Sequence, residues 1–267
     1  MTNGHIGDDF CTMLESKKEQ LHVCQKAIDV IGSVSRYIQE RCPAPVSGDD
    51  RARYAETMSS SVEDMLRRKL TALIPGSGFI GEDTSSPAFI NWVVDPIDGT
   101  NNFLNGFPFA ISVALMDENL EHAYIGIVKS VLDDAFYCAV DGEGAFSRIG
   151  NRTRPMNVKD TTASSSEISL FGMPVDKSKA ERMLGYVLKA YGEASDIKRI
   201  GPPSLDICRV ASGMARFYFA LDLKPCDVAA GSLILTEAGG HIVKRDDLYL
   251  FSAVDIDGDG VPTDIFG

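Results

Sequence analysis

Residues 92–103 read Trp92-Val-Val-Asp95-Pro96-Ile-Asp98-Gly99-Thr-Asn-Asn-Phe, and this stretch decides how the chain is organised. The three apolar residues at its start predict a buried strand. We expect Pro96 to end that strand, because proline has no N–H to give to a sheet ladder. Gly99 is typical of a tight turn. The carboxylates of Asp95 and Asp98 can therefore converge on one point, and such a group suits Mg²⁺, which shares its remaining ligands with water and phosphate.

The composition is that of a globular chain with an acidic balance. Its 267 residues are enough for one large domain or two modest ones. The net charge of −12 argues against nucleic acid as a partner, because a phosphate backbone needs a basic footprint. A small phosphorylated substrate stays compatible with this charge, since bound divalent cations invert the local field.

No segment predicts a membrane span or a secretion signal. No apolar run approaches the ~20 residues that cross a bilayer, and the first residues lack the basic and then apolar pattern of a signal peptide. The six cysteines show no paired spacing, which is typical of reduced thiols. We therefore expect a cytoplasmic protein without a membrane partner.

The first half of the chain predicts helices followed by strands. Apolar residues at helical spacing indicate a helix within residues 8–41, and a loop is expected at 47–50. A second helix is expected to start near Ser60, whose spacing to Glu63 makes a capping box. Short strands are predicted at 79–81, 111–115, 124–128 and 135–139, with a turn at 141–144.

Residues 148–166 are polar and predict a loop, which we take as the boundary between two α/β halves, 1–150 and 151–267. Beyond it we expect a new α/β unit whose strands lie near 170–171, 197–200 and 216–221. Helices are predicted at 180–191, 204–212 and 228–238. The fold class is therefore α/β, with elements of α+β.

Carboxylates recur in three separated stretches: Gly81-Glu82-Asp83, Asp95-Pro-Ile-Asp98 and Pro225-Cys226-Asp227. Taken singly, they would be surface charges, a turn aspartate and a helix N-cap. Brought together, they would cost several kcal/mol of repulsion and desolvation unless metal ions neutralise them. Two or three Mg²⁺ ions would do so, and would also polarise a phosphate and activate a bound water.

The residues after Asp98 add the other half of this chemistry. The N–H groups of Gly99 and Thr100 can hold phosphate oxygens at the start of a helix or turn. The Thr100 hydroxyl is placed to orient an attacking water. The sequence therefore predicts metal-assisted hydrolysis of a phosphate ester.

With these motifs the chain resembles the inositol monophosphatase superfamily of Mg²⁺-dependent, lithium-sensitive phosphomonoesterases. The resemblance covers roughly residues 10–245 and rests on 81–83, on 92–103 with 106–109, and on 223–231 with 236–240. It implies a layered sandwich of alternating helices and sheets, usually in a homodimer. It also implies a small phosphorylated metabolite as substrate and two or three Mg²⁺ ions, with Mn²⁺ as a substitute.

The resemblance further implies a role for each matching position. The first metal would be held by Glu82, Asp95 and the backbone carbonyl of Ile97, and the second by Asp95, Asp98 and Asp227. The catalytic water would be oriented by Glu82 and Thr100. Contacts to phosphate and substrate would come from Asp98, Gly99, Thr100, Gly201 and Asp227. Asp83 would support these residues without being a firm metal ligand.

Five positions depart from the family pattern. Ser59 stands where an aspartate usually bonds the catalytic threonine; its hydroxyl can still bond Thr100 but brings no charge, which leaves the number of metals open. On the alcohol side, Pro202 and Pro203 remove two N–H donors. Ala220 replaces the glutamate that contacts inositol hydroxyls, and Cys226 replaces a tryptophan.

These departures leave the substrate open. Inositol monophosphate is the family default, and the alternatives are a sugar phosphate (as for fructose-1,6-bisphosphatase), histidinol phosphate or a 3′-phosphonucleotide. A hypothesis of another class is a catalytically weakened homologue that binds metal or phosphate and regulates. At the end of the chain, residues 255–260 are interpreted as an acidic tail and not as a calcium loop, because Phe266 takes the place of the final glutamate.

Overall fold

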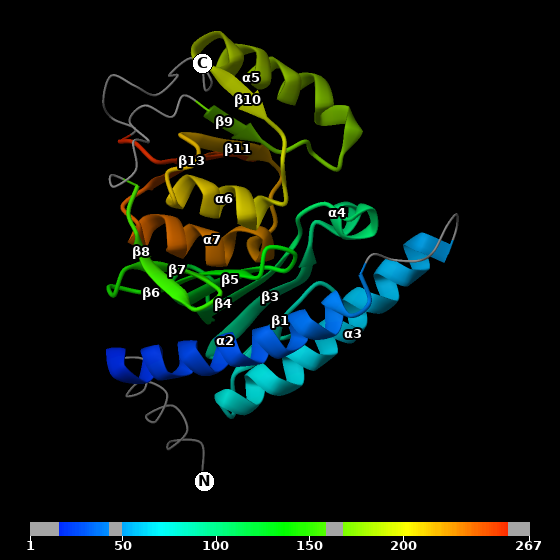
Figure 1. Ribbon diagram of the computed structural model, residues 1–267, viewed down its shortest axis with the longest axis vertical. Helices are drawn as coiled ribbons and strands as arrows, with labels where there is room; N and C mark the ends of the chain where they lie inside the picture. The colour runs from blue at the N-terminus through cyan, green and yellow to red at the C-terminus, as the bar shows by residue number, and fades with distance from the viewer. Residues whose placement is uncertain (1–15, 43–49, 159–167, 256–267) are drawn as a thin grey trace.

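The computed structural model describes residues 16–42, 50–158 and 168–255 (Figure 1). The beginning of the helix predicted within 8–41 and most of the acidic tail predicted from residue 255 fall outside these ranges.

Five layers of helix and sheet alternate through the protein. The first is a helical pair, α2 (Lys17–Gln39) and α3 (Asp50–Leu73). This pair covers one face of an eight-stranded sheet, and α6 (Pro203–Ala211) and α7 (Pro225–Glu237) cover the other face. A five-stranded sheet and then α5 (Ala180–Glu193) complete the stack (Figure 1). The predicted α/β sandwich of alternating layers is confirmed.

The larger sheet has the strand order β2-β1-β3-β4-β5-β6-β7-β8. In chain order its strands are β1 (Gly78–Ile80), β2 (Ser85–Ser86), β3 (Ile90–Asp98), β4 (Ala110–Asp117), β5 (Ala123–Ser130), β6 (Ala135–Val140), β7 (Ala145–Ile149) and β8 (Arg152–Met156). β1 lies parallel to β3, and from β3 onward each strand is antiparallel to the next.

The smaller sheet has the strand order β10-β9-β11-β13-β12. Its strands are β9 (Ile168–Phe171), β10 (Asp196–Lys198), β11 (Phe217–Leu221), β12 (His241–Arg245) and β13 (Leu248–Ser252). β9 is parallel to both of its neighbours, and the other pairs are antiparallel. Two short helices complete the description, α4 (Thr100–Asn105) and the 3₁₀-helix η2 (Lys177–Lys179).

Hydrophobic clusters fill the spaces between the layers. Leu66 and Trp92 belong to the cluster under the helical pair, Ile234 to the cluster around α6 and α7, and Phe219 to the cluster under α5. β3 and β4 are buried along almost their whole length. Helices on both faces of the sheet explain this burial, and with it the continuous apolar runs in the sequence.

The prediction that Pro96 ends its strand is wrong. β3 includes Pro96 and continues to Asp98, and its register against β4 shifts between Asp95 and Asp98. At such an irregularity the extra residue is not paired in the ladder, so the missing N–H of proline breaks no sheet hydrogen bond.

The predicted helix start near Ser60 is also wrong, because α3 already begins at Asp50. The Ser60 hydroxyl donates to Oδ2 of Asp83 at 2.7 Å, and Oε2 of Glu63 accepts the N–H of Glu82 at 2.7 Å. The residue types of a capping box here bind a neighbouring segment instead of the helix end. In the loop expected at 47–50, Asp50 is helical, and 47–49 lie outside the described residues.

The predicted loop at 148–166 is wrong for the part that the structure describes, since β7 and β8 form a hairpin there. β8 lies at the edge of the sheet, and four of its five residues are exposed, so its sequence lacks an apolar alternation. The proposed division between residues 150 and 151 falls in the turn of this hairpin. A division that follows the two sheets would come after Met156.

Across the described ranges, none of the helices is long and apolar enough to cross a membrane. The five cysteines there are free thiols: Cys24, Cys42, Cys138, Cys208 and Cys226.

Candidate functional site

A cavity of about 920 Å³ is lined by all the residues that the sequence predicts as metal ligands, water-orienting groups or phosphate contacts. The predicted residues in its lining are Glu82, Asp95, Ile97, Asp98, Gly99, Thr100, Gly201 and Asp227. They come from the end of β3, the segment after β1, and the starts of α4, α6 and α7. Asp83, expected in support, does not line the cavity and instead accepts a hydrogen bond from Ser60.

The end of β3 fixes two of the carboxylates by backbone hydrogen bonds. Oδ1 of Asp95 accepts the N–H of Ile97 at 3.0 Å, and Oδ2 of Asp98 accepts the N–H of Ser204 at 2.9 Å. The second bond joins β3 to the first turn of α6. Ser204 can donate because it is the second residue of α6, where an N–H has no acceptor within the helix.

Gly99 makes the turn between β3 and α4. Its φ of 92° lies in the left-handed region, where a side chain is strained, and a Cβ there would lie 3.0 Å from Cβ of Pro202. Glycine therefore allows the Asp98 turn to lie directly against the start of α6.

Glu82 is positioned by α3. Oε2 of Glu63, a buried side chain, accepts the N–H groups of Glu82 at 2.7 Å and of Asp83 at 3.1 Å. The Ser59 hydroxyl donates to Oε2 of Glu82 at 3.1 Å. The bond from Ser59 to Thr100 that the sequence allowed is not formed; the Thr100 hydroxyl donates to the carbonyl oxygen of Ile97 at 3.4 Å.

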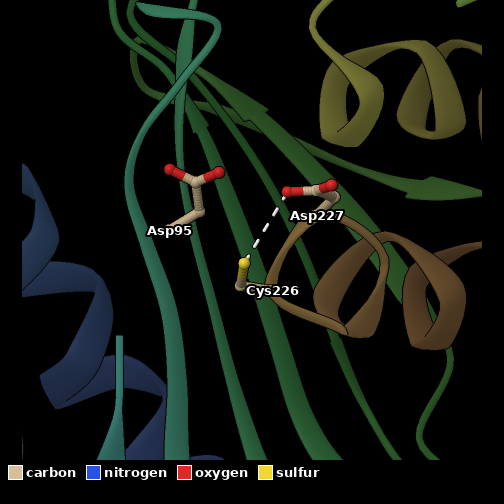
Figure 2. A group of neighbouring side chains, drawn as sticks. All are labelled: Asp95, Cys226 and Asp227. Atoms are coloured by element: carbon tan, nitrogen blue, oxygen red, sulfur yellow. Dashed lines mark hydrogen bonds between the residues drawn. The ribbon is translucent and has the colours of Figure 1, made fainter. Parts of the chain in front are cut away.

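Asp227 lies in the first turn of α7, opposite the end of β3 (Figure 2). Its Oδ2 accepts the N–H of Lys224 at 2.8 Å, and the Cys226 thiol donates to its Oδ1 at 3.6 Å. Asp95, Cys226 and Asp227 each offer one ligand atom, and these atoms lie within 4.8 Å of one another. The thiol of Cys226 is a part of this group that the sequence did not predict.

The carboxylates of the site are buried and lie close together. Burial and the repulsion between like charges therefore favour their protonated forms. Burial and then the charges of Asp98, Asp227 and Glu82 raise the pKa of Asp95 well above its usual range. Burial raises the pKa of Asp98 to about 7, although hydrogen bonds from Ser204 oppose the shift. Burial also raises the pKa of Asp227. A divalent cation would remove this penalty, so the donor set fits a hard cation such as Mg²⁺.

Gly201 lies in the cavity, but its N–H already has a partner. It donates to Oδ2 of Asp206 at 2.9 Å, and Asp206 also forms an ion pair with Arg209. Burial raises the pKa of Asp206 to about 6. Asp206 lines the cavity and was not predicted from the sequence, although an aspartate among the apolar residues Leu205, Ile207 and Val210 was an available signal.

Apolar side chains form much of the remaining lining: Phe107, Phe171, Met173, Val175, Ile200 and Leu223. Ala220 also lines the cavity and is buried on β11, so no carboxylate is presented from that position. Phe107 is 61% exposed, which leaves a large apolar surface open to a ligand.

Comparison with known proteins gives one consistent result. The sequence profile of the inositol monophosphatase family matches residues 19–255. An inositol-1-monophosphatase of Rhizobium meliloti is 34% identical over 227 residues, which cover 82% of this chain and 83% of that protein. A protein named Nus factor SuhB of Xylella fastidiosa is 32% identical over 230 residues, covering 85% of this chain and 82% of that protein.

The fold agrees with that of solved relatives. The structure of Mycobacterium tuberculosis SuhB superposes with a TM-score of 0.74 at 25% identity, and the match covers 87% of this chain and 91% of that one. A SuhB structure from Bartonella henselae gives a TM-score of 0.75, also at 25% identity, over 86% of this chain and 93% of that one.

Proposed function

The chain belongs to the inositol monophosphatase family, and from this premise we propose that it hydrolyses a small phosphate monoester to an alcohol and inorganic phosphate with the help of Mg²⁺. One observation carries the proposal: the cavity gathers Glu82, Asp95, Asp98 and Asp227 beside Thr100. In the described part of the chain, no lysine or arginine forms an ion pair with these four carboxylates. A cation is the natural partner for such a group.

The protein's own residues would divide the work in this proposal. Glu82, Asp95, Asp98, Asp227 and the Ile97 carbonyl would hold two metal ions, with Mn²⁺ able to replace Mg²⁺. A bound metal ion would offset the negative charge of the phosphate oxygens and activate a water. Glu82 and Thr100 would orient that water, and the N–H groups of Gly99 and Thr100 would hold the phosphate.

The hydrogen bonds described above support this division. Ser59 and Glu63 fix the carboxylate and the backbone of Glu82, so the water-orienting group is held at two points. The N–H of Gly201 donates a hydrogen bond to Asp206. We therefore assign to Gly201 a role in shaping the part of the cavity that holds the alcohol group, and not a hydrogen bond to the phosphate.

Inositol monophosphate is the first substrate to test, since relatives are named inositol monophosphatases. The missing carboxylate at Ala220 and the apolar lining favour testing sugar phosphates, histidinol phosphate and 3′-phosphonucleotides beside it. The measurement is phosphate release over this panel with Mg²⁺, with Mn²⁺ and with EDTA. We expect turnover of at least one monoester with metal and none with EDTA. Absence of metal-dependent turnover on every member would refute the proposal.

A second candidate is a regulatory protein that binds metal or phosphate with little catalysis. Ser59 favours it, because the position carries no charge and bonds Glu82 instead of Thr100. Relatives named Nus factor SuhB also favour it. Metal-dependent stabilisation in thermal unfolding without phosphate release would support this candidate over the enzyme.

We also propose a homodimer and a cytoplasmic location. α5 exposes Leu184, Leu188 and Tyr191 at helical spacing, and such a surface can be covered by a second copy. The free thiols are compatible with a reducing compartment. Light scattering in solution tests the dimer, and a mass of 28.9 kDa would contradict it.

A further inference from the structure

A second cavity lies between α2 and the strands β6 and β7, and the proposed function does not use it. Its volume is about 840 Å³, within the usual range for small-molecule sites. The helical pair, whose α2 lines this cavity, and the helices α6 and α7, which reach the candidate active site, cover opposite faces of the large sheet (Figure 1). The two linings share no residue.

A buried lysine stands at the edge of this cavity. Only 1% of the Lys129 side chain is exposed, and its Nζ lies 4.2 Å from the ring centre of Phe136, which lines the cavity. Its ion-pair partner is Asp134, a lining residue whose side chain is 72% exposed. Burying an ammonium group is costly. The carboxylate that balances this charge is exposed and can rotate towards solvent.

Two arginines add to this charge. Arg36 of α2 and Arg148 of β7 both line the cavity, and Cζ of Arg148 lies 4.8 Å from the ring centre of Phe136. Within the described residues, neither guanidinium forms an ion pair with a carboxylate. Burial lowers the pKa of Lys129; the hydrogen bond and charge of Asp134 oppose this shift, and the charges of Arg148 and Arg36 add to it.

The lining carboxylates, Asp29 and Asp134, balance the two lining arginines, so Lys129 at the edge brings one excess positive charge in a chain of net charge −12. Phe136 and Ile28 give the cavity an apolar wall, and Gly32 leaves space beside the Phe136 ring. Guanidinium groups bind phosphate through two parallel hydrogen bonds, which suits a doubly charged group.

We propose that this cavity binds a small phosphorylated molecule, with its phosphate held by Arg36 and Arg148 and its remainder against Phe136. Asp134 turns towards solvent when the ligand enters, and Lys129 adds its charge to the phosphate. The ligand joins α2 to the β6–β7 hairpin. This site is independent of the proposed phosphatase activity, because it needs neither the metal nor any residue of the first cavity.

The test follows phosphate binding residue by residue. Inorganic phosphate is titrated into the ¹⁵N-labelled full chain in EDTA, with KCl holding the ionic strength constant. We expect saturable shifts of the amides of Gly32, Phe136 and Gly150, which line the cavity. Shifts confined to the first cavity, or the same shifts with KCl alone, would overturn the proposal.

Variants test the two guanidinium groups. Arg148→Met and Arg36→Met should each weaken phosphate binding at these amides by about tenfold, the loss of one charge-assisted contact. The matched control is Arg68→Met, an exposed arginine of α3 outside both cavities, which should bind as the wild type does. Arg36 is exposed, so its variant keeps the test valid if Arg148→Met does not fold. Binding within twofold of wild type in Arg36→Met and in any folded Arg148→Met would overturn the assignment.

Discussion

The carboxylate of Glu63 on α3 accepts the backbone N–H of Glu82 at 2.7 Å, so a helix of the first layer sets the position of a candidate catalytic residue. Glu63 is 2% exposed, and a Cβ on Gly81 would lie 2.5 Å from its Oε2. The Gly81-Glu82-Asp83 turn therefore packs directly on this carboxylate. Glycine is required at position 81 because any side chain would push the turn away.

We predict that Glu63→Gln weakens the metal site without emptying it. Glutamine keeps one acceptor oxygen but loses the charge that strengthens both backbone hydrogen bonds. The Mg²⁺ concentration for half-maximal phosphate release should rise about tenfold, as for other groups that orient a ligand. Glu56→Gln, an exposed glutamate on the same helix, is the matched control and should leave this concentration unchanged.

Replacing Ser59 tests whether the site can take a further cation. In Ser59→Asp a carboxylate would lie where the hydroxyl now lies 3.1 Å from Oε2 of Glu82. The like charges should lower the melting temperature in EDTA by about 2 °C or more, and Mg²⁺ should raise it by more than in the wild type. Ser60→Asp adds its charge beside Asp83 outside the cavity and is the control. An equal Mg²⁺ response in both variants would contradict this prediction.

Asp95→Asn should separate activity from stability. Asp95 is the carboxylate with the most acidic neighbours, and an amide there is a poorer cation ligand, so phosphate release should fall by ~100-fold or more. In EDTA at pH 7–8 the variant should melt higher than the wild type, because a neutral amide avoids the cost of burying an acid among other carboxylates. Near wild-type turnover would refute the role of Asp95 as a metal ligand.

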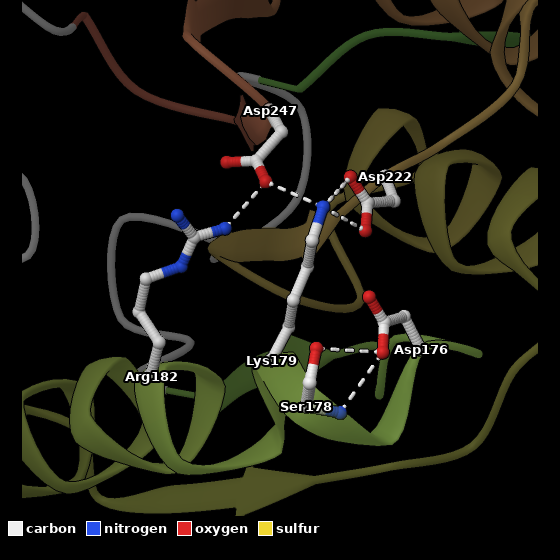
Figure 3. Close-up of polar contacts among 6 residues, drawn as sticks. All are labelled: Asp176, Ser178, Lys179, Arg182, Asp222 and Asp247. Carbon is white, nitrogen blue, oxygen red and sulfur yellow. Dashed lines mark hydrogen bonds and ion pairs between the residues drawn. The ribbon is translucent and has the colours of Figure 1, made fainter.

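The stability at low pH should depend on Asp247, which lies between two cations at the start of α5 (Figure 3). Hydrogen bonds from Arg182 and Lys179 lower the pKa of Asp247 to about 2. A depressed carboxyl pKa contributes stability above the unfolded value of about 3.9, and this contribution is lost as the pH falls towards 2.

Asp247→Asn should therefore lower the free energy of unfolding by about 1 kcal/mol at pH 7, after allowance for solvent screening. The difference from wild type should shrink between pH 4 and pH 2. Thermal melts at these pH values measure it. Asp246→Asn is the control, since Asp246 is exposed and asparagine accepts its left-handed φ of 53°. A difference that is constant with pH would contradict the assignment to Asp247.

The motif around Asp95 could be predicted from sequence because apolar strands and acidic strand ends are local patterns. That Glu82, Asp98 and Asp227 line one cavity is not a local pattern, and it was expected because the three acidic stretches together suit metal ions and match the motifs of the family. Ser60 and Glu63 show where local reasoning fails. Their spacing matches a capping box, but their partners come from a segment about twenty residues away.

The errors at β8 and at Pro96 have a common cause. Both concern hydrogen bonds that a sequence does not display: an edge strand needs few apolar residues, and a proline is tolerated where the register shifts. Asp206 was missed because its partners, Gly201 and Arg209, become neighbours only once α6 has formed.

The hydrogen bond between the Asp98 carboxylate and the Ser204 N–H crosses the boundary between the large sheet and α6. Because Asp227 reaches the same cavity from α7, a cation bound there would hold together segments that separate when the chain unfolds. Its binding would then be coupled to folding by mass action, and would add about 2.7 kcal/mol to stability at a free concentration one hundred times the dissociation constant. A chelator would act on such a protein as a mild denaturant as well as an inhibitor.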